Sequence, residues 1–154
     1  MIAERIVDFM LPNVECLGCK LANKMDPVHV IYEDAQVCCF LDIEPFNEGH
    51  TLILPKKHFL DVEELDPLTA NAIMKASIKI SKALKHLFAP DGISVCQNGG
   101  QFNDLAHYHM HLIPRFQGQP FYNEAEIDNT KEKQNLKETK TNLIKQLHVD
   151  QWRD

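Results

Sequence analysis

The heptapeptide HYHMHLI at residues 107–113 constrains the fold more than any other part of the sequence, because histidines alternate in it with apolar residues. Successive side chains of a β-strand point to opposite faces. A strand over 107–113 therefore places three imidazoles on one face and Tyr108, Met110 and Leu112 on the other. Each imidazole has two ring nitrogens that need partners, so three together are a poor filling for a core. The alternation predicts a strand that presents a functional site, and the plain alternative is a histidine-rich surface strand.

Turn signals and apolar periodicity predict the remaining elements. Apolar runs bounded by Pro, Gly, Asn and Asp predict strands at 28–32, 36–41, 50–54 and 93–96. Asp66 followed by Pro67 predicts the start of a helix, and apolar residues at steps of three and four continue it from Ile73 to Leu87. Because strands and helices do not alternate, the order of elements indicates an α+β fold with an antiparallel sheet.

The last part of the chain differs from the rest in composition. Residues 128–148 are rich in Lys, Glu, Asn and Thr, and their only apolar stripe consists of Leu136, Leu143, Ile144 and Leu147. The stripe predicts a helix. Its narrowness favours a role on the surface or against a partner rather than in the core.

Length and charge narrow the class of protein. A chain of 154 residues is one domain by the usual prior. A net charge of −6 argues against a general nucleic-acid or anionic-membrane partner, and there is no run of eighteen apolar residues that would predict a membrane span. The first eight residues carry acids too early for a signal peptide. An odd number of cysteines, five, is not a disulfide framework and favours the cytoplasm.

Cys16 and Cys19 have the spacing of half a zinc site. The pair alone is equally compatible with a redox pair or with chance. Cys38, Cys39 and Cys96 lie within predicted strands and are interpreted as small apolar residues.

The alternation of histidines with apolar residues resembles the signature of the histidine triad (HIT) family of nucleotide hydrolases and transferases. Residues 40–43, 50–58 and 98–100 stand where that family places its nucleotide-binding strands. The resemblance covers about 15–116 and is closest to the Hint-like branch and its bacterial, zinc-containing members. It implies a five-stranded antiparallel sheet, one long central helix and a homodimer, with 117–154 as a partly helical extension of a single domain.

The resemblance also implies a reaction at the α-phosphate of a nucleoside phosphoramidate or a dinucleoside polyphosphate. His109 matches the nucleophile, which forms a nucleotidyl-histidine intermediate. His111 and His50 match donors to the phosphate oxygens, and Asp42 matches the acceptor from the ribose hydroxyls. A purine nucleotide is the implied partner, and the residues that match its base and phosphate contacts are Leu17, Phe40, Ile43, Leu52, Asn98 and Asn103.

The sequence departs from the family just before the first triad histidine. Many relatives have Gly-Gln-Ser or Gly-Gln-Thr there, whereas this chain has Phe102-Asn103-Asp104. Asp104 thus replaces a hydroxyl that contacts the leaving atom. A carboxylate beside a phosphate repels it unless protonated, so Asp104 is interpreted as a general acid for the leaving group or as a residue that points away and braces the loop.

The resemblance implies a structural zinc ion held by Cys16, Cys19, His58 and His107. Magnesium is expected only as a companion of polyphosphate substrates. Two other classes of function stay open. One is a binding or scaffold module that keeps the nucleotide pocket without efficient turnover, and the other is a zinc–thiol redox switch at Cys16 and Cys19. A nucleotidyl transferase is a variant of the enzyme hypothesis.

Overall fold

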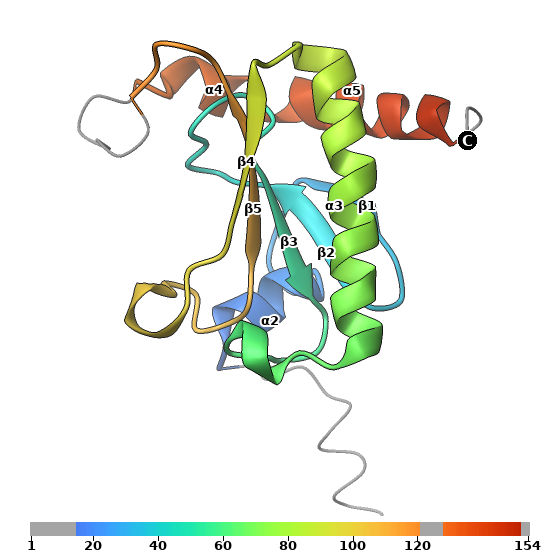
Figure 1. Ribbon diagram of the computed structural model, residues 1–154, viewed down its shortest axis with the longest axis vertical. Helices are drawn as coiled ribbons and strands as arrows, with labels where there is room; N and C mark the ends of the chain where they lie inside the picture. Colours follow the sequence, from blue (N-terminus) through green and yellow to red (C-terminus); the bar gives the residue numbers. More distant parts are fainter. Residues whose placement is uncertain (1–14, 121–127, 152–154) are drawn as a thin grey trace, which may run out of the picture.

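The computed structural model describes residues 15–120 and 128–151 and contains one antiparallel five-stranded sheet (Figure 1). The first eight residues, on which the signal-peptide prediction rests, lie outside the described part. The strand order is β1-β2-β3-β5-β4. This arrangement confirms the predicted α+β class with an antiparallel sheet. The strands are β1 (Val30–Glu33), β2 (Val37–Leu41), β3 (Thr51–Pro55), β4 (Gly92–Cys96) and β5 (Met110–Arg115).

The long helix begins where the sequence predicts. Asp66 accepts a hydrogen bond from the backbone N–H of Thr69 at 2.8 Å, Pro67 occupies the first turn, and α3 ends before Ala89, which has a left-handed φ of 43°. None of the helices in the described ranges combines the length and hydropathy of a membrane span. The helices are α2 (Leu17–Ala22), α3 (Pro67–Phe88), α4 (Thr130–Gln134) and α5 (Leu136–Asp150), with 3-10 turns η1 (Val62–Glu64) and η2 (Gly100–Phe102).

The two faces of the sheet have separate apolar clusters, because alternate residues of β2 and β3 point to opposite sides. On the side of α3, Cys39 and Ile53 pair across the strands and belong to the main core. On the other side, Phe40 pairs with Leu52 in a smaller cluster that includes Ala22 of α2. The sheet is thus covered by α3 on one face and touched by α2 on the other (Figure 1).

The predicted start of the histidine strand is wrong. β5 begins only at Met110 and continues through Pro114. The backbone N–H of Tyr108 instead donates to the carbonyl of Phe59 at 2.7 Å, which holds the preceding residues outside the strand ladder. The predicted apolar face is nevertheless confirmed, because the side chains of Tyr108, Met110 and Leu112 all lie in the main core. The other strands differ from their predicted bounds by a residue or two.

The C-terminal segment is helical, but its predicted surface role is wrong. Two helices replace the single predicted one, and they meet at Asn135. The side chain of Leu143 is completely buried in the main core, where Leu136, Ile144 and Leu147 pack against it. Because α5 crosses one end of α3 and contacts β1, its thin apolar stripe completes the core between them (Figure 1).

We expect Leu143→Ala to lower the free energy of unfolding by about 2–5 kcal/mol, because it removes most of a fully buried apolar side chain and leaves a cavity in the core. Val149→Ala on the same helix, where the side chain is 40% exposed, is the control and should change it by less than about 0.5 kcal/mol. Urea unfolding measures both variants. Equal effects would mean that α5 is not part of the core.

Candidate active site

The nucleophile candidate His109 has one ring nitrogen fixed by the backbone. Its Nδ1 lies 2.9 Å from the carbonyl oxygen of His107, and a carbonyl only accepts, so Nδ1 carries the proton. The lone pair of the neutral ring is therefore on Nε2. The ring itself is 2% exposed, which holds this nitrogen in a single direction.

His50 and His111 form a second fixed unit beside it. The backbone N–H of Phe46 donates to His50 Nδ1 at 3.0 Å, so His50 carries its proton on Nε2 and donates it to His111 Nδ1 at 2.9 Å. His111 must then carry its own proton on Nε2. The ring centroids of His109 and His111 are 4.9 Å apart, so this N–H is a donor next to the nucleophile. His50 has a different partner from the predicted phosphate oxygen, because its N–H is directed at His111.

Gly49 places His50 at the start of β3. Its φ is +88°, and an added Cβ would meet the side chains of Leu84 and Phe88 at 2.7 and 2.8 Å. Both the backbone conformation and the packing against α3 therefore favour glycine here.

Two carboxylates flank the histidines. Asp42 follows β2, accepts from the backbone N–H of Glu44 at 2.9 Å, and places Oδ2 3.6 Å from His50 Nε2. Its burial raises its pKa. Asp104 places Oδ1 3.3 Å from His109 Nε2, and its side chain is 86% exposed. When the His109 ring is neutral and the Asp104 carboxyl is ionised, neither Nε2 nor Oδ1 carries a proton, so no hydrogen bond joins them. The carboxylate then occupies the space in front of Nε2.

The other predicted nucleotide-binding residues fall into two groups. Phe40 and Leu52 are buried on the sheet face that carries His111, which is opposite Leu52 in the β3–β5 register. Leu17 and Ile43 expose 48% and 64% of their surface. The structure therefore provides an apolar floor of Phe40 and Leu52 on the sheet face of His111, whereas Leu17 and Ile43 are exposed to solvent.

The segment before the triad is held by Asn103. Its amide nitrogen donates to the carbonyl of Leu60 at 2.8 Å, and its amide oxygen accepts weakly from the backbone N–H of Leu105 at 3.3 Å. Asn103 thus ties the loop to the η1 region, whereas the resemblance implies a phosphate contact. Phe102, beside it, is 80% exposed, and Asn98 is an exposed residue after β4.

The four predicted metal ligands come together. His107 Nδ1 lies 3.6 Å from the Sγ of Cys16 and 3.5 Å from that of Cys19, and His58 Nδ1 lies 3.4 Å from Cys19 Sγ. Nitrogen and sulfur ligands of a tetrahedral zinc ion are about 3.5 Å apart, given Zn–N and Zn–S bonds of about 2.0 and 2.3 Å. The proton of His107 is on Nε2, which donates to the carbonyl of Pro55 at 2.8 Å, so the Nδ1 lone pair faces the thiols.

Gly18, within the cysteine pair, is a requirement of this cluster that the sequence analysis did not single out. A Cβ at residue 18 would lie 2.2 Å from the Cβ of His107, so only glycine lets α2 approach the histidine. A glycine between two closely spaced cysteines was the available signal. Phe46 and Pro55 also hold histidines of the site, but they do so through a backbone N–H and a backbone carbonyl, so the residue types at these positions gave no signal of this role.

Asp42, His50 and His111 form a second group of close ligand-type atoms within the described residues. The tautomers do not suit metal binding here, because His50 Nε2 carries a proton and therefore has no lone pair for a metal, and the lone pair of His111 Nδ1 accepts that proton. Mg²⁺ also prefers a shell of oxygen ligands, and this group offers a single carboxylate. The group is better suited to hydrogen bonding than to an ion, and the expected magnesium finds no ligand set in it.

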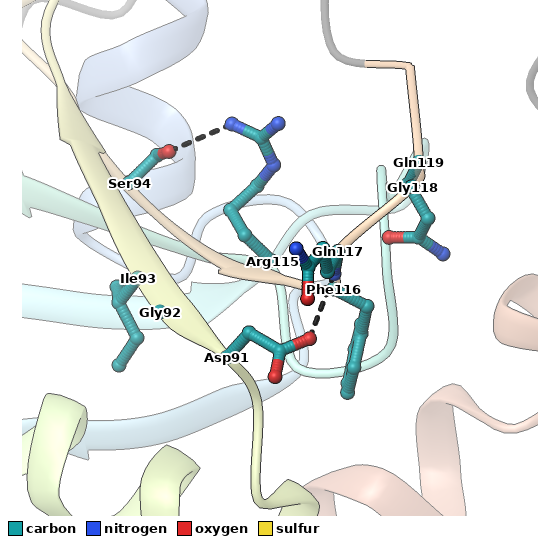
Figure 2. Close-up of a pocket in the computed structure, with 9 residues that line it drawn as sticks. All are labelled: Asp91, Gly92, Ile93, Ser94, Arg115, Phe116, Gln117, Gly118 and Gln119. Carbon is teal, nitrogen blue, oxygen red and sulfur yellow. Dashed lines mark hydrogen bonds between the residues drawn. The ribbon is translucent and has the colours of Figure 1, made fainter.

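A surface hollow of about 450 Å³ lies elsewhere (Figure 2). Residues 91–94 and 115–119 line it at the far end of β4 and β5, where Arg115 donates to the hydroxyl of Ser94 at 3.0 Å. It contains none of the triad histidines. The histidines lie at the other end of β5.

The structure combines a five-stranded antiparallel sheet, a long helix that covers one face, and three alternating histidines at and just before the start of β5. These features define a histidine triad protein. The chain belongs to the HIT family: the family's HIT domain model matches residues 23–118. The expected HIT fold is thereby confirmed.

Known relatives agree with this assignment. An uncharacterised HIT-like protein of Methanocaldococcus jannaschii is 39% identical over 105 residues, which cover 67% of this chain and 81% of the relative. Adenylylsulfatase HINT3 of Arabidopsis thaliana is 33% identical over 103 residues, or 66% of this chain and 52% of the relative. The crystal structure of a zinc-bound histidine triad protein from Mycobacterium smegmatis has a TM-score of 0.75 at 27% identity, covering 90% of this chain and 97% of its own.

The buried pair His50 and His111 predicts a loss of stability in mild acid. Burial is the main cause that lowers the pKa of each to about 4 from 6.5. Between these values the unfolded chain binds more protons than the folded one, so the unfolding free energy falls as the pH falls from 6.5 towards 4. We expect a loss on the order of 2 kcal/mol from the pair.

Chemical unfolding at pH 7.0, 6.0 and 5.0 measures this loss. His50→Gln removes one of the two titrating groups and should flatten the pH dependence. His148→Gln, at an exposed position of α5, is the matched control and should leave it unchanged. The same slope in both variants would contradict the assignment of the loss to the buried pair.

Proposed function

We propose that the chain hydrolyses a purine nucleotide at its α-phosphate, with a nucleoside phosphoramidate or a dinucleoside polyphosphate as substrate. One observation carries the proposal: the carbonyl of His107 holds the proton of His109 on Nδ1, which leaves the Nε2 lone pair directed at the space that Asp104 borders. A neutral imidazole in this tautomer is a nucleophile at neutral pH.

The reaction has two displacements. Nε2 of His109 attacks phosphorus, the bond to the leaving group breaks with its electron pair, and a nucleotidyl-histidine forms. Water then attacks the same phosphorus and releases the nucleoside monophosphate and neutral His109. The N–H of His111, positioned by His50, stabilises the negative charge on the phosphate oxygens in both steps. His50 acts through His111 as a positioning residue.

The nucleoside is proposed to lie against the sheet face that bears Phe40 and Leu52, with Leu17 and Ile43 as exposed walls. Asp42 accepts from the ribose hydroxyls, because one of its oxygens is engaged by a backbone N–H and the carboxylate has further lone pairs. The relative named adenylylsulfatase supports an adenylyl compound as the substrate class. Asn98 is proposed as a phosphate contact from its place after β4.

A structural zinc ion is part of the proposal. Its support is the tetrahedral spacing of Cys16, Cys19, His58 and His107, together with the zinc-bound structure of a related fold. Zinc would tie α2 and the end of β3 to the residue whose carbonyl fixes His109. A closed set of four protein ligands supplies structure and leaves no position open for a substrate.

The wider organisation follows the resemblance. We treat 15–151 as parts of one domain, supported by the burial of Leu143 between α5 and the main core. β4 is an edge strand with Val95 56% exposed, and Met74 and Ile78 on α3 are similarly exposed, which suits a homodimer formed across strand and helix. The five cysteines form no disulfide, which suits a reducing cytoplasm.

Release of adenosine monophosphate from adenosine 5′-phosphoramidate and from diadenosine tetraphosphate tests the reaction. We expect His109→Ala to lower kcat/KM at least about a thousandfold, because it removes the atom that attacks. His86→Ala, at an exposed histidine of α3, is the matched control and should stay within twofold of the wild type. Acid quenching followed by mass spectrometry should detect an adenylyl group on His109.

Other results would select other functions. Nucleotide binding without turnover would support the scaffold module. Transfer of the adenylyl group to an added phosphate acceptor, in preference to water, would support the transferase. Turnover by His109→Ala at the wild-type rate would contradict a histidine nucleophile altogether.

Metal analysis tests the zinc proposal. We expect about one zinc per protomer, and Cys19→Ser should lose it together with thermal stability because thiolate ligands dominate such a site. Gly18→Ala should weaken zinc binding by about tenfold or more through the collision with His107. Cys96→Ser, at a partly exposed thiol outside the cluster, is the control. A reversible disulfide between Cys16 and Cys19 with no zinc in the reduced protein would instead support the redox switch.

A further inference from the structure

Asp104 stands in the path of the substrate. Its Oδ1 is 3.3 Å from Nε2 of His109, and a reacting phosphorus must approach this nitrogen to about 3–3.5 Å. The carboxylate and the phosphoryl group thus compete for the same space. Because the side chain is 86% exposed, it can rotate aside into solvent, and its charge then remains next to the phosphoryl group.

The Asp104 carboxylate lies on the solvent side of His109. The proposed nucleoside position, by Asp42 and the buried Phe40, is on the sheet. The leaving group therefore extends from the phosphorus towards solvent, past the loop that carries Asp104. That loop is fixed independently of Asp104, since Asn103 bonds to Leu60.

The two neighbouring imidazoles do not offset the charge of Asp104. His50 and His111 are neutral at pH 7, because burial lowers the pKa of each to about 4. The negative charge of Asp104 is felt by Asp42, where it adds to the effect of burial in raising the pKa. The two lysines that follow β3 have acidic partners of their own, Lys56 with Glu33 at 3.1 Å and Lys57 with Asp66 at 3.8 Å.

We propose that Asp104 selects the leaving group by charge, favouring an amine that carries a positive charge and disfavouring a phosphate or sulfate. This inference rests on the proposed function and names the preferred substrate class within it, a nucleoside phosphoramidate of a cationic amine. The role differs from the general acid that the sequence suggested. The proposed role works through the charge of the carboxylate beside the leaving group and does not require the transfer of a proton.

The step balances without a further reactant. Nε2 of His109 forms a bond to phosphorus while the P–N bond breaks, and the electron pair of that bond stays with the nitrogen. A proton from water completes the departing amine, which leaves as a neutral molecule, and the proton released when water attacks phosphorus in the second displacement restores the balance. A cationic group further along the amine is attracted by Asp104. A departing polyphosphate or sulfate is repelled by it.

Three adenosine 5′-phosphoramidates with leaving groups of the same length test the proposal. The amines are 1,4-diaminobutane, butylamine and 4-aminobutanoate, which present a positive, neutral and negative end. We expect the wild-type kcat/KM to fall in that order by roughly three- to fivefold per step, the size of an exposed charge–charge interaction. In Asp104→Asn the three values, divided by the neutral one, should lie within twofold of each other. In Asp104→Glu the order should persist.

Two controls separate charge from structure. High salt should reduce the wild-type preference, because exposed charges are screened. Glu44→Gln removes another exposed acid near Asp42 and should keep the wild-type order. The same order in Asp104→Asn as in the wild type, no order in the wild type, or an equal loss on all three substrates in Asp104→Asn would overturn the proposal. If the wild type cleaves neither these three compounds nor diadenosine tetraphosphate, the proposed function fails as well, and that result is distinct from equal hydrolysis of all three.

Discussion

The bonds of His107 join the candidate metal cluster to the candidate nucleophile. Its Nδ1 faces the thiols of Cys16 and Cys19, its Nε2–H donates to the carbonyl of Pro55, and its own carbonyl accepts from His109. One residue therefore connects α2, the end of β3 and the nucleophile. Because it is completely buried, none of these bonds is exchanged easily for water, and loss of one leaves an unpaired polar group inside the protein. The rigidity of His109 thus depends on groups that never touch a nucleotide.

The cost of this arrangement is desolvation of histidine. His50 and His111 are kept neutral by burial. The lone pair and the N–H of His50 are both matched, by the N–H of Phe46 and by His111, and the lone pair of His111 is matched by His50. Protonation of either ring would break this series of hydrogen bonds, since an imidazolium has two donors and no acceptor. The same condition that makes the site sensitive to acid keeps a directed N–H available at neutral pH.

The sequence was sufficient for whatever depends on local pattern. The start of α3 at Asp66 and Pro67, the apolar stripe from Ile73, and the shared face of Tyr108, Met110 and Leu112 all follow from periodicity and capping, and the structure contains them. The start of β5 did not follow, because Tyr108 is withdrawn from the ladder by the carbonyl of Phe59, a group distant in sequence. Leu143 was placed outside the core for the same reason. A thin stripe becomes core only when another element, here α3, leaves a gap for it.

Roles within the site follow from backbone partners, which a sequence does not display. His107, His109 and His111 are two residues apart and look equivalent in the pattern, yet their protons are on Nε2, Nδ1 and Nε2. A carbonyl fixes each of the first two, and a neighbouring imidazole fixes the third. In the proposed function, His107 consequently offers a lone pair to a metal, His109 offers one to phosphorus, and His111 offers an N–H to the phosphate oxygens. Exchanging these partners would exchange the functions without changing a single histidine, so the chemistry of the triad is a property of the loop and strand geometry around it.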